Sequence, residues 1–178
     1  MPQDLILEES AGLFRITALK TFRRTAGVIF DALPASLLPS VSAIDRVIHE
    51  SGALSPGSVG GVERPWYKHA GQEDNLVVLA GFRDVELFRQ GRSVRFRIGP
   101  ARIEKDGTLL FDRPVMLSWP VEVFHRIISS PERGSASVNL AVRRAGFDFR
   151  TEFNIYDLDP ATGEAKAIRE GRLDQFGE

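Results

Sequence analysis

The 178-residue chain contains no cysteine. Disulfide bonds, thiolate metal sites and cysteine nucleophiles are therefore excluded, and a metal ion would have to be held by histidine, carboxylate, amide or water. Histidine is scarce too, with three residues in the whole sequence. Because imidazole is the commonest metal ligand and titrates near neutral pH, the positions of these three residues carry most of the chemical information.

An excess of charge of one sign is also missing. The chain has 23 lysines and arginines against 24 aspartates and glutamates, which leaves a net charge of −1. Such a balance gives no general electrostatic attraction for nucleic acid or for an anionic membrane surface, so we expect neither as a partner. Arginine greatly outnumbers lysine, which favours planar, bidentate contacts to carboxylate or phosphate groups.

Long hydrophobic runs are absent, and no stretch approaches the length of a transmembrane helix. The first ten residues are acidic and lack the basic start and the long apolar region of a secretory signal. We therefore expect a cytoplasmic protein that does not enter a membrane.

Helical periodicity is the last scarce feature. Only residues 34–38, which begin with proline, predict a short helical turn. Short apolar runs separated by Gly, Pro, Asp or Ser dominate instead, and this pattern is typical of a β-sandwich or a β-barrel. Predicted strands cover residues 13–22, 41–49, 58–66, 76–80, 84–88, 93–98, 109–111, 115–119, 124–130 and 136–142, and a long half-buried strand covers 147–155.

The predicted strands follow one another without a linker, a repeat or a low-complexity segment. Such strands bury a core only by closing into a barrel or by stacking two sheets. The sequence therefore predicts a single domain over 1–178. We expect an N-terminal arm at 1–50, a barrel core at 58–157, and a C-terminal strap at 158–178 that forms a hairpin or lies over the surface.

A first group of regularly spaced residues surrounds the most apolar strand. Gly61 is followed by Tyr67 and His69, which are separated by one residue. After a gap of four residues comes Asp74, and after six more comes Gly81. His69 and Asp74 thus both lie just before the predicted strand at 76–80.

A second group lies further along the chain. Pro120 precedes His125, and 38 residues separate Gly81 from Pro120. The two groups resemble the two motifs of the cupin superfamily, the RmlC-like jelly rolls. In that family two glycines frame a His-x-His pair and a glutamate, and a later Pro-x-Gly precedes another histidine. The resemblance covers the central third of the chain, and the all-β pattern covers the rest.

The sequence departs from the family's pattern at several positions. In the first motif Tyr67 replaces the first histidine and Asp74 replaces the glutamate. In the second motif Pro114, Glu122 and Ser129 stand where the family has Gly, Gly and Asn. The first motif is therefore degenerate, and it supplies one histidine and one acid.

The resemblance implies an all-β fold, a single double-stranded β-helix or jelly-roll barrel with extended N-terminal strands and little helix. Opposed strands of such a barrel share one inner wall. If Asp74 points inward, so does Leu76, and if His125 points inward, so does Ile127. A homodimer is implied as well, because a segment as long as 1–50 covers the edge of its own sheet or of a partner's sheet.

The resemblance also implies a metal site inside the barrel. His69, His125 and Asp74, with Gln72, would supply imidazole and oxygen ligands for Fe, Mn, Ni or Zn. Glu73 is a rival for the acid position, but with Glu73 the closing glycine comes one residue late. Two histidines and one carboxylate leave coordination positions open for substrate or water. The first functional hypothesis is a small-molecule-binding cupin with a divalent metal, acting as a dioxygenase or an isomerase.

The second hypothesis is a metal-free cupin. The stretch 66–87 is similar to the sugar-nucleotide epimerases and 3,4-ketoisomerases of the same superfamily, which use His and Tyr or acid groups for proton transfer beside a carbonyl. This similarity implies His69 and Tyr67 as acid and base, with His125 as a further catalytic candidate, since imidazole titrates near the operating pH. Four arginines are candidates for contacts to a diphosphate: Arg83, Arg95, Arg97 and Arg126.

The third hypothesis is a non-enzymatic ligand-binding barrel, like the seed-storage cupins, which the loss of one motif histidine favours. Structural roles are the alternative for each residue: Asp74 would cap a turn, Tyr67 would be a rim aromatic, and Gly61 would serve a turn. His49 has no wider polar cluster around it and is interpreted as structural. Residues 154–160 predict a turn, and no chemistry is assigned to them.

Overall fold

The computed structural model describes residues 2–38 and 40–175, which form two large sheets and a small hairpin. The first sheet contains, in spatial order, β1 (Ile6–Ser10), β2 (Phe14–Ala18), β13 (Val115–Trp119), β8 (Gln72–Gly81), β15 (Ser135–Arg143) and β5 (Ala43–His49). The second contains β12 (Thr108–Phe111), β11 (Arg102–Lys105), β10 (Arg92–Gly99), β9 (Arg83–Arg89), β14 (Phe124–Ser129), β7 (Trp66–Lys68), β16 (Ile155–Leu158) and β17 (Ala165–Arg169), with β6 (Leu54–Ser55) beside β14. The hairpin is β3 (Lys20–Thr25) with β4 (Val28–Ala32).

Helix is confined to single turns, as expected. They are η1 (Pro2–Leu5), η2 (Ala35–Leu37), α1 (Phe149–Glu152) and η3 (Gly171–Asp174). The short turn predicted at 34–38 is thus formed by η2. No helix among the described residues is long and apolar enough to span a membrane.

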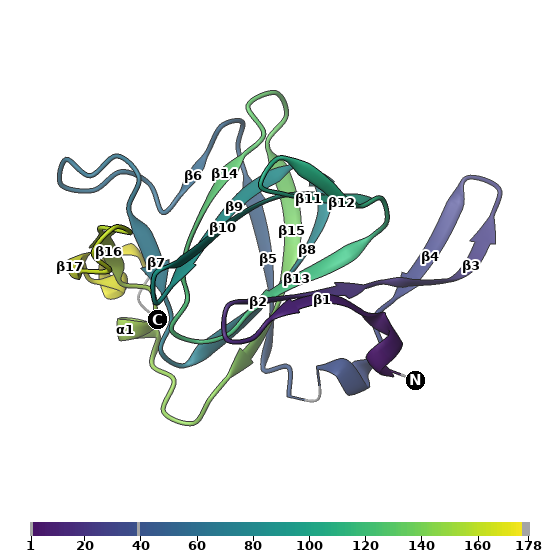
Figure 1. Ribbon diagram of the computed structural model, residues 1–178, viewed down its shortest axis with the longest axis horizontal. Coiled ribbons are helices and arrows are strands. Elements are labelled where there is room, and N and C mark those ends of the chain that lie inside the picture. Colours follow the sequence, from purple (N-terminus) through teal and green to yellow (C-terminus); the bar gives the residue numbers. More distant parts are fainter. Residues whose placement is uncertain (1, 39, 176–178) are drawn as a thin grey trace.

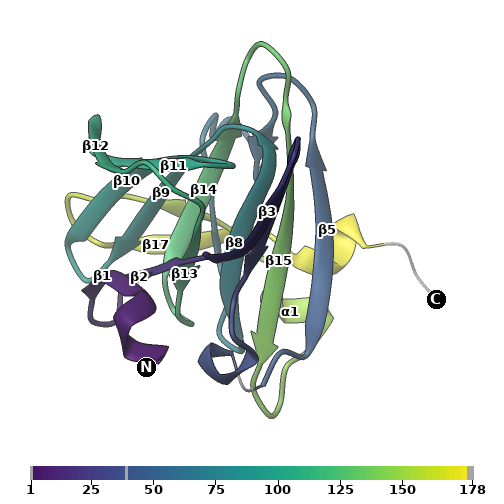
Figure 2. The ribbon, with the colours of Figure 1, turned by 90° about the vertical axis from the view of Figure 1, so that its right-hand side faces the viewer.

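The two large sheets face each other and enclose the core (Figures 1 and 2). Their strands pair in antiparallel fashion throughout the described residues. The all-β jelly-roll prediction is therefore confirmed. No described strand is hydrogen-bonded into both sheets, so the jelly roll is not a closed ring of strands.

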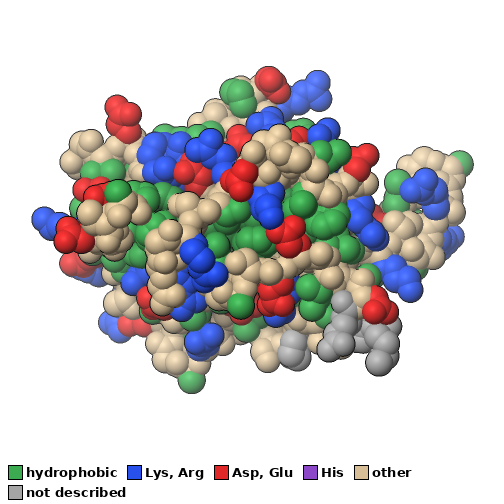
Figure 3. Space-filling model, in the orientation of Figure 1, with side chains coloured by type: hydrophobic (Ala, Val, Ile, Leu, Met, Phe, Trp, Pro, Cys, Tyr) green, Lys and Arg blue, Asp and Glu red, His purple; other side chains and the backbone are tan. Residues whose placement is uncertain are grey.

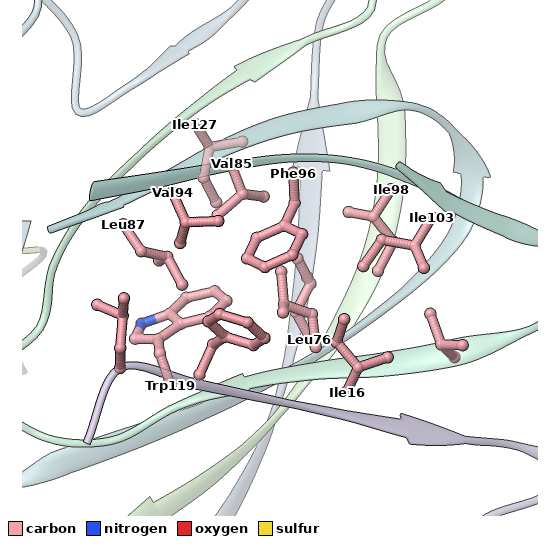
Figure 4. Close-up of a cluster of buried hydrophobic side chains, with 14 of the residues drawn as sticks. Ile16, Leu76, Val85, Leu87, Val94, Phe96, Ile98, Ile103, Trp119 and Ile127 are labelled. Atoms are coloured by element: carbon pink, nitrogen blue, oxygen red, sulfur yellow. The ribbon is translucent and has the colours of Figure 1, made fainter. Parts of the chain in front are cut away.

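Side chains from the inner faces of both sheets form the core (Figure 4). Ile16 and Leu76 come from the first sheet, and Val85, Phe96 and Ile127 come from the second. Burying one such side chain contributes about 1.5–3 kcal/mol, so this cluster holds the sheets together. Because strand residues alternate between faces, the predicted inward orientation of Leu76 and Ile127 is confirmed by their burial.

The N-terminal 50 residues supply the outer strands on both sides of the first sheet. β1 and β2 lie beside β13 at one edge, and β5 lies beside β15 at the other. This segment thus covers the edges of its own sheet. The β3–β4 hairpin pairs with neither large sheet and projects from the body (Figures 1 and 3).

The strand predicted over 147–155 is wrong. α1 occupies its centre, and β16 begins only at Ile155. The side chain of Asp148 accepts a hydrogen bond from the Arg150 N–H and caps the helical turn. Phe149 and Phe153 stack with their ring centroids 6.1 Å apart. These phenylalanines therefore pack on one another through a turn, and tertiary packing overrides the period-two pattern.

The strand predicted at 58–66 is wrong as well. This segment forms a turn closed by an isolated bridge between Val59 and Val62, and β7 begins at Trp66. Three glycines in 57–61 favour the turn, and two of them, Gly60 and Gly61, have positive φ angles. The polar C-terminal tail does form the expected hairpin, through β16 and β17 at the edge of the second sheet.

Candidate functional site

A cavity of about 330 Å³ lies between the two sheets. Its walls come from β5, β8, β13 and β15 on one side and from β6, β7, β9 and β14 on the other, with residues of the α1 region at one end. All three histidines of the chain line it. The volume is at the lower end of the range of about 300–1,000 Å³ that is usual for small-molecule sites.

His69, Asp74 and His125 converge in this cavity. Nε2 of His69 lies 3.6 Å from Oδ2 of Asp74, and Nε2 of His125 lies 3.9 Å from the same oxygen. One ligand atom of each residue lies within 4.8 Å of the other two, and all three side chains are buried. The structure thus brings together the two motif histidines and the acid that the sequence pattern singled out.

The backbone determines which nitrogen each imidazole presents to the acid. Nδ1 of His69 is hydrogen-bonded to the carbonyl oxygen of Glu152, and Nδ1 of His125 lies 3.3 Å from the carbonyl oxygen of Val123. A carbonyl oxygen only accepts, so Nδ1 carries the proton in both neutral rings and Nε2 keeps its lone pair. Burial, assisted by the neighbouring His69, lowers the pKa of His125 to about 4, so this ring is neutral at pH 7. When both rings are neutral, two lone pairs face one carboxylate oxygen of Asp74.

Neighbouring amides hold the carboxylate of Asp74. Gln72 Nε2 and Asn139 Nδ2 donate to Oδ1 of Asp74 at 2.9 and 2.7 Å. Oε1 of Gln72 accepts from Nε of Arg143 at 3.1 Å, so both ends of the Gln72 amide are engaged. Gln72 thus positions Asp74 in this structure, and its role as a metal ligand stays a prediction. Glu73 lines a separate hollow and does not join the histidines.

The turn before β14 connects the two histidine segments. Glu122 has a φ of 64°, in the left-handed region that favours glycine, and it stands where the cupin motif has Gly. Its N–H donates to the carbonyl oxygen of His69 at 2.8 Å, and its carboxylate pairs with Lys68 at 3.1 Å. The chain therefore keeps a backbone conformation suited to glycine at a position where it has lost the glycine itself.

Aromatic rings surround the two imidazoles. The Tyr67 ring lies 6.3 Å from that of His69 and 5.9 Å from that of His125, measured between centroids. Burial raises the pKa of Tyr67, so its phenol is protonated at neutral pH. Trp119 lies 5.2 Å from His125, and its buried indole N–H has no hydrogen-bond partner within the described residues. Tyr67 and Trp119 both line the cavity, and each carries a hydrogen-bond donor at the end of its ring.

Only one of the four arginines proposed as anion contacts lines the cavity, and that is Arg83. Arg95 and Arg126 form ion pairs with Glu86, and Arg97 forms one with Asp84. These three arginines belong to a charged network on the second sheet and are not available inside.

The sequence analysis missed several residues that line the cavity. His49 was interpreted as structural, yet it lines the same space as the other histidines. Asn139 and Arg143 on β15 and Trp119 on β13 were not considered at all. Asn139 lies on the predicted strand at 136–142 and Arg143 follows it directly, four residues further on, so both share a face when the strand is extended by one residue. Ser135, Ser137, Asn139 and Arg143 occupy alternate positions, and this polar face was the available signal.

The titration of His49 gives an expected pH dependence. Burial, together with the positive charge of Arg83, lowers the pKa of His49 to about 4. The unfolded chain therefore binds this proton at a higher pH than the folded chain, and stability falls as the pH drops from about 6.5 to about 4. Urea unfolding at pH 7 and at pH 4.5 should show that the free energy of unfolding falls less with pH in His49→Gln than in the wild type. We expect a difference of about 1–2 kcal/mol, because the ring is only half-buried. An equal loss in both proteins would contradict this origin.

This chain is similar to known proteins in its structure. No protein-family model matches the sequence, and no curated protein sequence is similar to it. The sugar 3,4-ketoisomerase QdtA from Thermoanaerobacterium thermosaccharolyticum, in complex with TDP, matches with 14% identity and a TM-score of 0.52, over 76% of this chain and 82% of its own. A dTDP sugar isomerase from Desulfovibrio desulfuricans G20 matches with 14% identity and a TM-score of 0.54, over 75% of this chain and 80% of its own.

The rmlC epimerase from Mycobacterium tuberculosis matches with 11% identity and a TM-score of 0.50, over 79% of this chain and 68% of its own. Identities this low carry no activity across, because one fold supports many functions. The structural similarity does agree with the two facing antiparallel sheets of this chain. The chain shares its RmlC-like jelly-roll fold with these three enzymes.

Proposed function

We propose that this chain is a small-molecule enzyme that holds a divalent metal ion with His69, Asp74 and His125. One observation carries the proposal: two imidazole Nε2 atoms, with Nδ1 committed to backbone carbonyls, face a single oxygen of a buried carboxylate. Without a cation or an extra proton, the lone pairs of these three atoms would repel one another. Two histidines and one carboxylate are the ligand set that leaves positions open for substrate.

The spacing of the three atoms supports a metal ion. Zn–N and Zn–O bonds are about 2.0–2.2 Å long, so two ligand atoms of one ion lie at most about 4.4 Å apart. The Asp74 oxygen lies 3.6 and 3.9 Å from the two nitrogens, within this limit. The third pair of ligand atoms lies within 4.8 Å, so a shift of a few tenths of an ångström brings all three into range of one ion. Hydrogen bonds from Gln72 and Asn139 hold the carboxylate in place, as second-layer partners of metal sites usually do.

A bound ion would act as a Lewis acid toward a substrate oxygen or lower the pKa of a bound water molecule. The protein would contribute orientation, exclusion of water and a proton. Tyr67 stands beside both imidazoles and stays protonated, so it is the expected proton donor.

Protein purified without chelators should contain about one metal ion per chain by elemental analysis. Absence of metal, with no rise in melting temperature on adding Fe, Mn, Ni or Zn, would contradict the proposal.

A second candidate function is metal-free isomerisation or epimerisation of a sugar nucleotide. The observation in its favour is the fold shared with two sugar isomerases and an epimerase, one of them bound to TDP. In this case one proton would be shared among His69, Asp74 and His125, and Tyr67 would serve as the acid beside the substrate carbonyl. Thermal-shift screening with dTDP- and UDP-sugars distinguishes the two functions. A null result across that set, with metal present, favours the metal enzyme over the sugar-nucleotide enzyme.

The assembly that fits this chain is a homodimer formed through the β3–β4 hairpin. An isolated two-stranded hairpin is only marginally stable in water. This hairpin nevertheless exposes large apolar side chains, with Phe22 64% exposed and Ile29 55% exposed. On the body, Ile44 and Ile48 of β5 are exposed as well. Adjacent apolar side chains of this size favour a protein partner, and a second copy of the chain brings the same surfaces together.

Light scattering coupled to gel filtration tests the dimer. The wild type should elute as a dimer at micromolar concentration, and the double variant Phe22→Ser/Ile29→Ser should elute as a monomer. Leu173→Ser in η3 is the matched control, because Leu173 is 55% exposed and η3 contacts α1, on the opposite side of the molecule from the hairpin (Figure 1). A monomeric wild type, or a hairpin variant that stays dimeric, would rule the interface out.

A further inference from the structure

One end of the cavity contains an arginine without a counterion. Arg83 is 1% exposed. Within residues 2–38 and 40–175, no carboxylate forms an ion pair with it. Buried arginines are almost always paired, because an unpaired charge is costly to remove from water. Arg83 therefore lacks, among the described residues, the carboxylate counterion that a buried arginine usually has.

Hydrogen bonds orient Arg83 and leave part of it open. Nε donates to Oγ of Ser135 at 2.9 Å, and Nη2 donates to the carbonyl oxygen of Val47 at 3.2 Å. The Ser129 hydroxyl donates to the same Ser135 oxygen at 2.9 Å, which holds that serine. A guanidinium has five N–H donors, so three donors of Arg83 have no acceptor among the described residues. The group is fixed in place and unsatisfied.

A second unsatisfied group lies beside it. Nδ1 of His49 is buried and has no hydrogen-bond partner in the part of the chain that the structure describes. His49 is paired across β5 and β15 with Ser135, the residue that orients Arg83. Both His49 and Arg83 line the cavity. A neutral imidazole can carry its proton on Nδ1, so Arg83 and His49 can together form a donor cluster for an acceptor that the described residues do not supply.

This donor cluster is at the opposite end of the cavity from the metal ligands. Arg83 is paired across β9 and β14 with Ser129, four residues beyond His125 on the same strand. Four residues of a strand span about 13 Å. The apolar side chains of Leu76 and Ile127 lie in between and line the cavity. A ligand that reaches both ends would have a polar reacting group, a short apolar middle and a hydrogen-bond acceptor at the far end.

We infer that Arg83 and His49 bind a carboxylate group of the ligand that occupies this cavity. The inference deepens the proposed function, since it names a chemical group of the ligand, but it requires neither the metal nor catalysis. A carboxylate fits the available charge better than a phosphate monoester, which carries up to two negative charges. Arg83 is the single free cation that the described residues place here, because Arg143 is shared with Asp45 and Gln72. The side-by-side N–H donors of a guanidinium match the two oxygens of a carboxylate.

The test uses butyrate, its neutral isostere butyramide, and inorganic phosphate as probes on the metal-free full-length protein. We expect saturable butyrate binding by calorimetry or by NMR titration, with butyramide and phosphate each at least tenfold weaker. Arg83→Met should weaken butyrate binding at least tenfold, and His49→Phe should weaken it several-fold. Arg126→Met is the matched control, because that arginine is paired with Glu86 outside the cavity and its loss should leave binding unchanged.

Three results would overturn the inference: equal affinity for butyrate and butyramide, tighter binding of phosphate, or unchanged butyrate binding in Arg83→Met. The melting temperature of Arg83→Met without ligand separates binding from a purely structural role. An unpaired buried charge gives an unchanged or higher melting temperature when it is removed, whereas a large drop or failure to fold indicates a structural arginine and contradicts the inference. His125→Ala should abolish metal binding and keep butyrate binding, so failure of the metal proposal is distinguishable from failure of this one.

Discussion

Asp74→Asn is expected to lower the affinity of the protein for a divalent metal by at least about 100-fold, because losing even an outer partner of a metal ligand typically costs 10–100-fold. Asparagine has nearly the same shape and can still accept the hydrogen bonds from Gln72 and Asn139. It lacks the negative charge that balances the ion. Metal content after dialysis against a competing chelator, measured by elemental analysis, gives the affinity directly. His69→Ala and His125→Ala should have effects of similar size.

Two further variants make the comparison specific. Asn139→Ala removes one hydrogen bond to the carboxylate and should cost about 10–100-fold in metal affinity, less than the loss of the ligand itself. Glu73→Gln alters the neighbouring acid, which does not face the histidines, and should leave metal binding unchanged. If Glu73→Gln removes the metal while Asp74→Asn retains it, the assignment of the acid is wrong. If both variants bind metal as tightly as the wild type, His69, Asp74 and His125 do not hold a metal ion.

Gly81→Ala is expected to destabilise the fold by about 3–5 kcal/mol, at the upper end of single-residue effects. A Cβ atom at Gly81 would lie 2.0 Å from the carbonyl oxygen of Gly134 and 3.0 Å from Cα of Ser135. These are backbone atoms and cannot move aside without distorting the pairing of β8 with β15. The φ angle of +68° adds strain for any side chain. Differential scanning calorimetry should show a decrease in melting temperature of roughly 10 °C.

Gly91→Ala separates the two causes. Gly91 has a φ of +74° but has open space where a Cβ atom would be placed. Gly91→Ala should therefore lower the free energy of unfolding only through the strain of a positive φ angle, by about 1 kcal/mol. Equal destabilisation by the two substitutions would mean that steric contact at Gly81 is unimportant. A larger effect at Gly81 would identify close backbone approach as the reason for the glycine that closes the first motif.

The sequence predicted the fold and the centre of the site because both depend on local pattern. Strand residues alternate between faces, so Asp74 with Leu76 and His125 with Ile127 could be assigned to one wall from spacing alone. The motif spacing then set His69 opposite His125. The alternating pattern failed where aromatic packing and a capping aspartate stabilised α1, since neither depends on period-two alternation.

The other end of the cavity could not be predicted because it depends on strand order. His49 and Arg83 belong to strands in different sheets, and Ser135 on a third strand connects them. No spacing in the sequence indicates that β5 pairs with β15 or that β14 lies beside β9. Three of the four arginines that the family resemblance suggested as diphosphate contacts are paired with carboxylates, which only the cross-strand register reveals.

The hydrogen bond between His69 and the carbonyl oxygen of Glu152 has a consequence for biosynthesis. The first motif emerges from the ribosome well before residue 152 does, and β5 must wait for β15 before it can pair. The orientation of His69 therefore forms late, after nearly the whole chain has been synthesised. Pairings this distant in sequence also slow folding. A nascent chain that stops before residue 152 has all the motif residues but lacks the carbonyl group that orients His69.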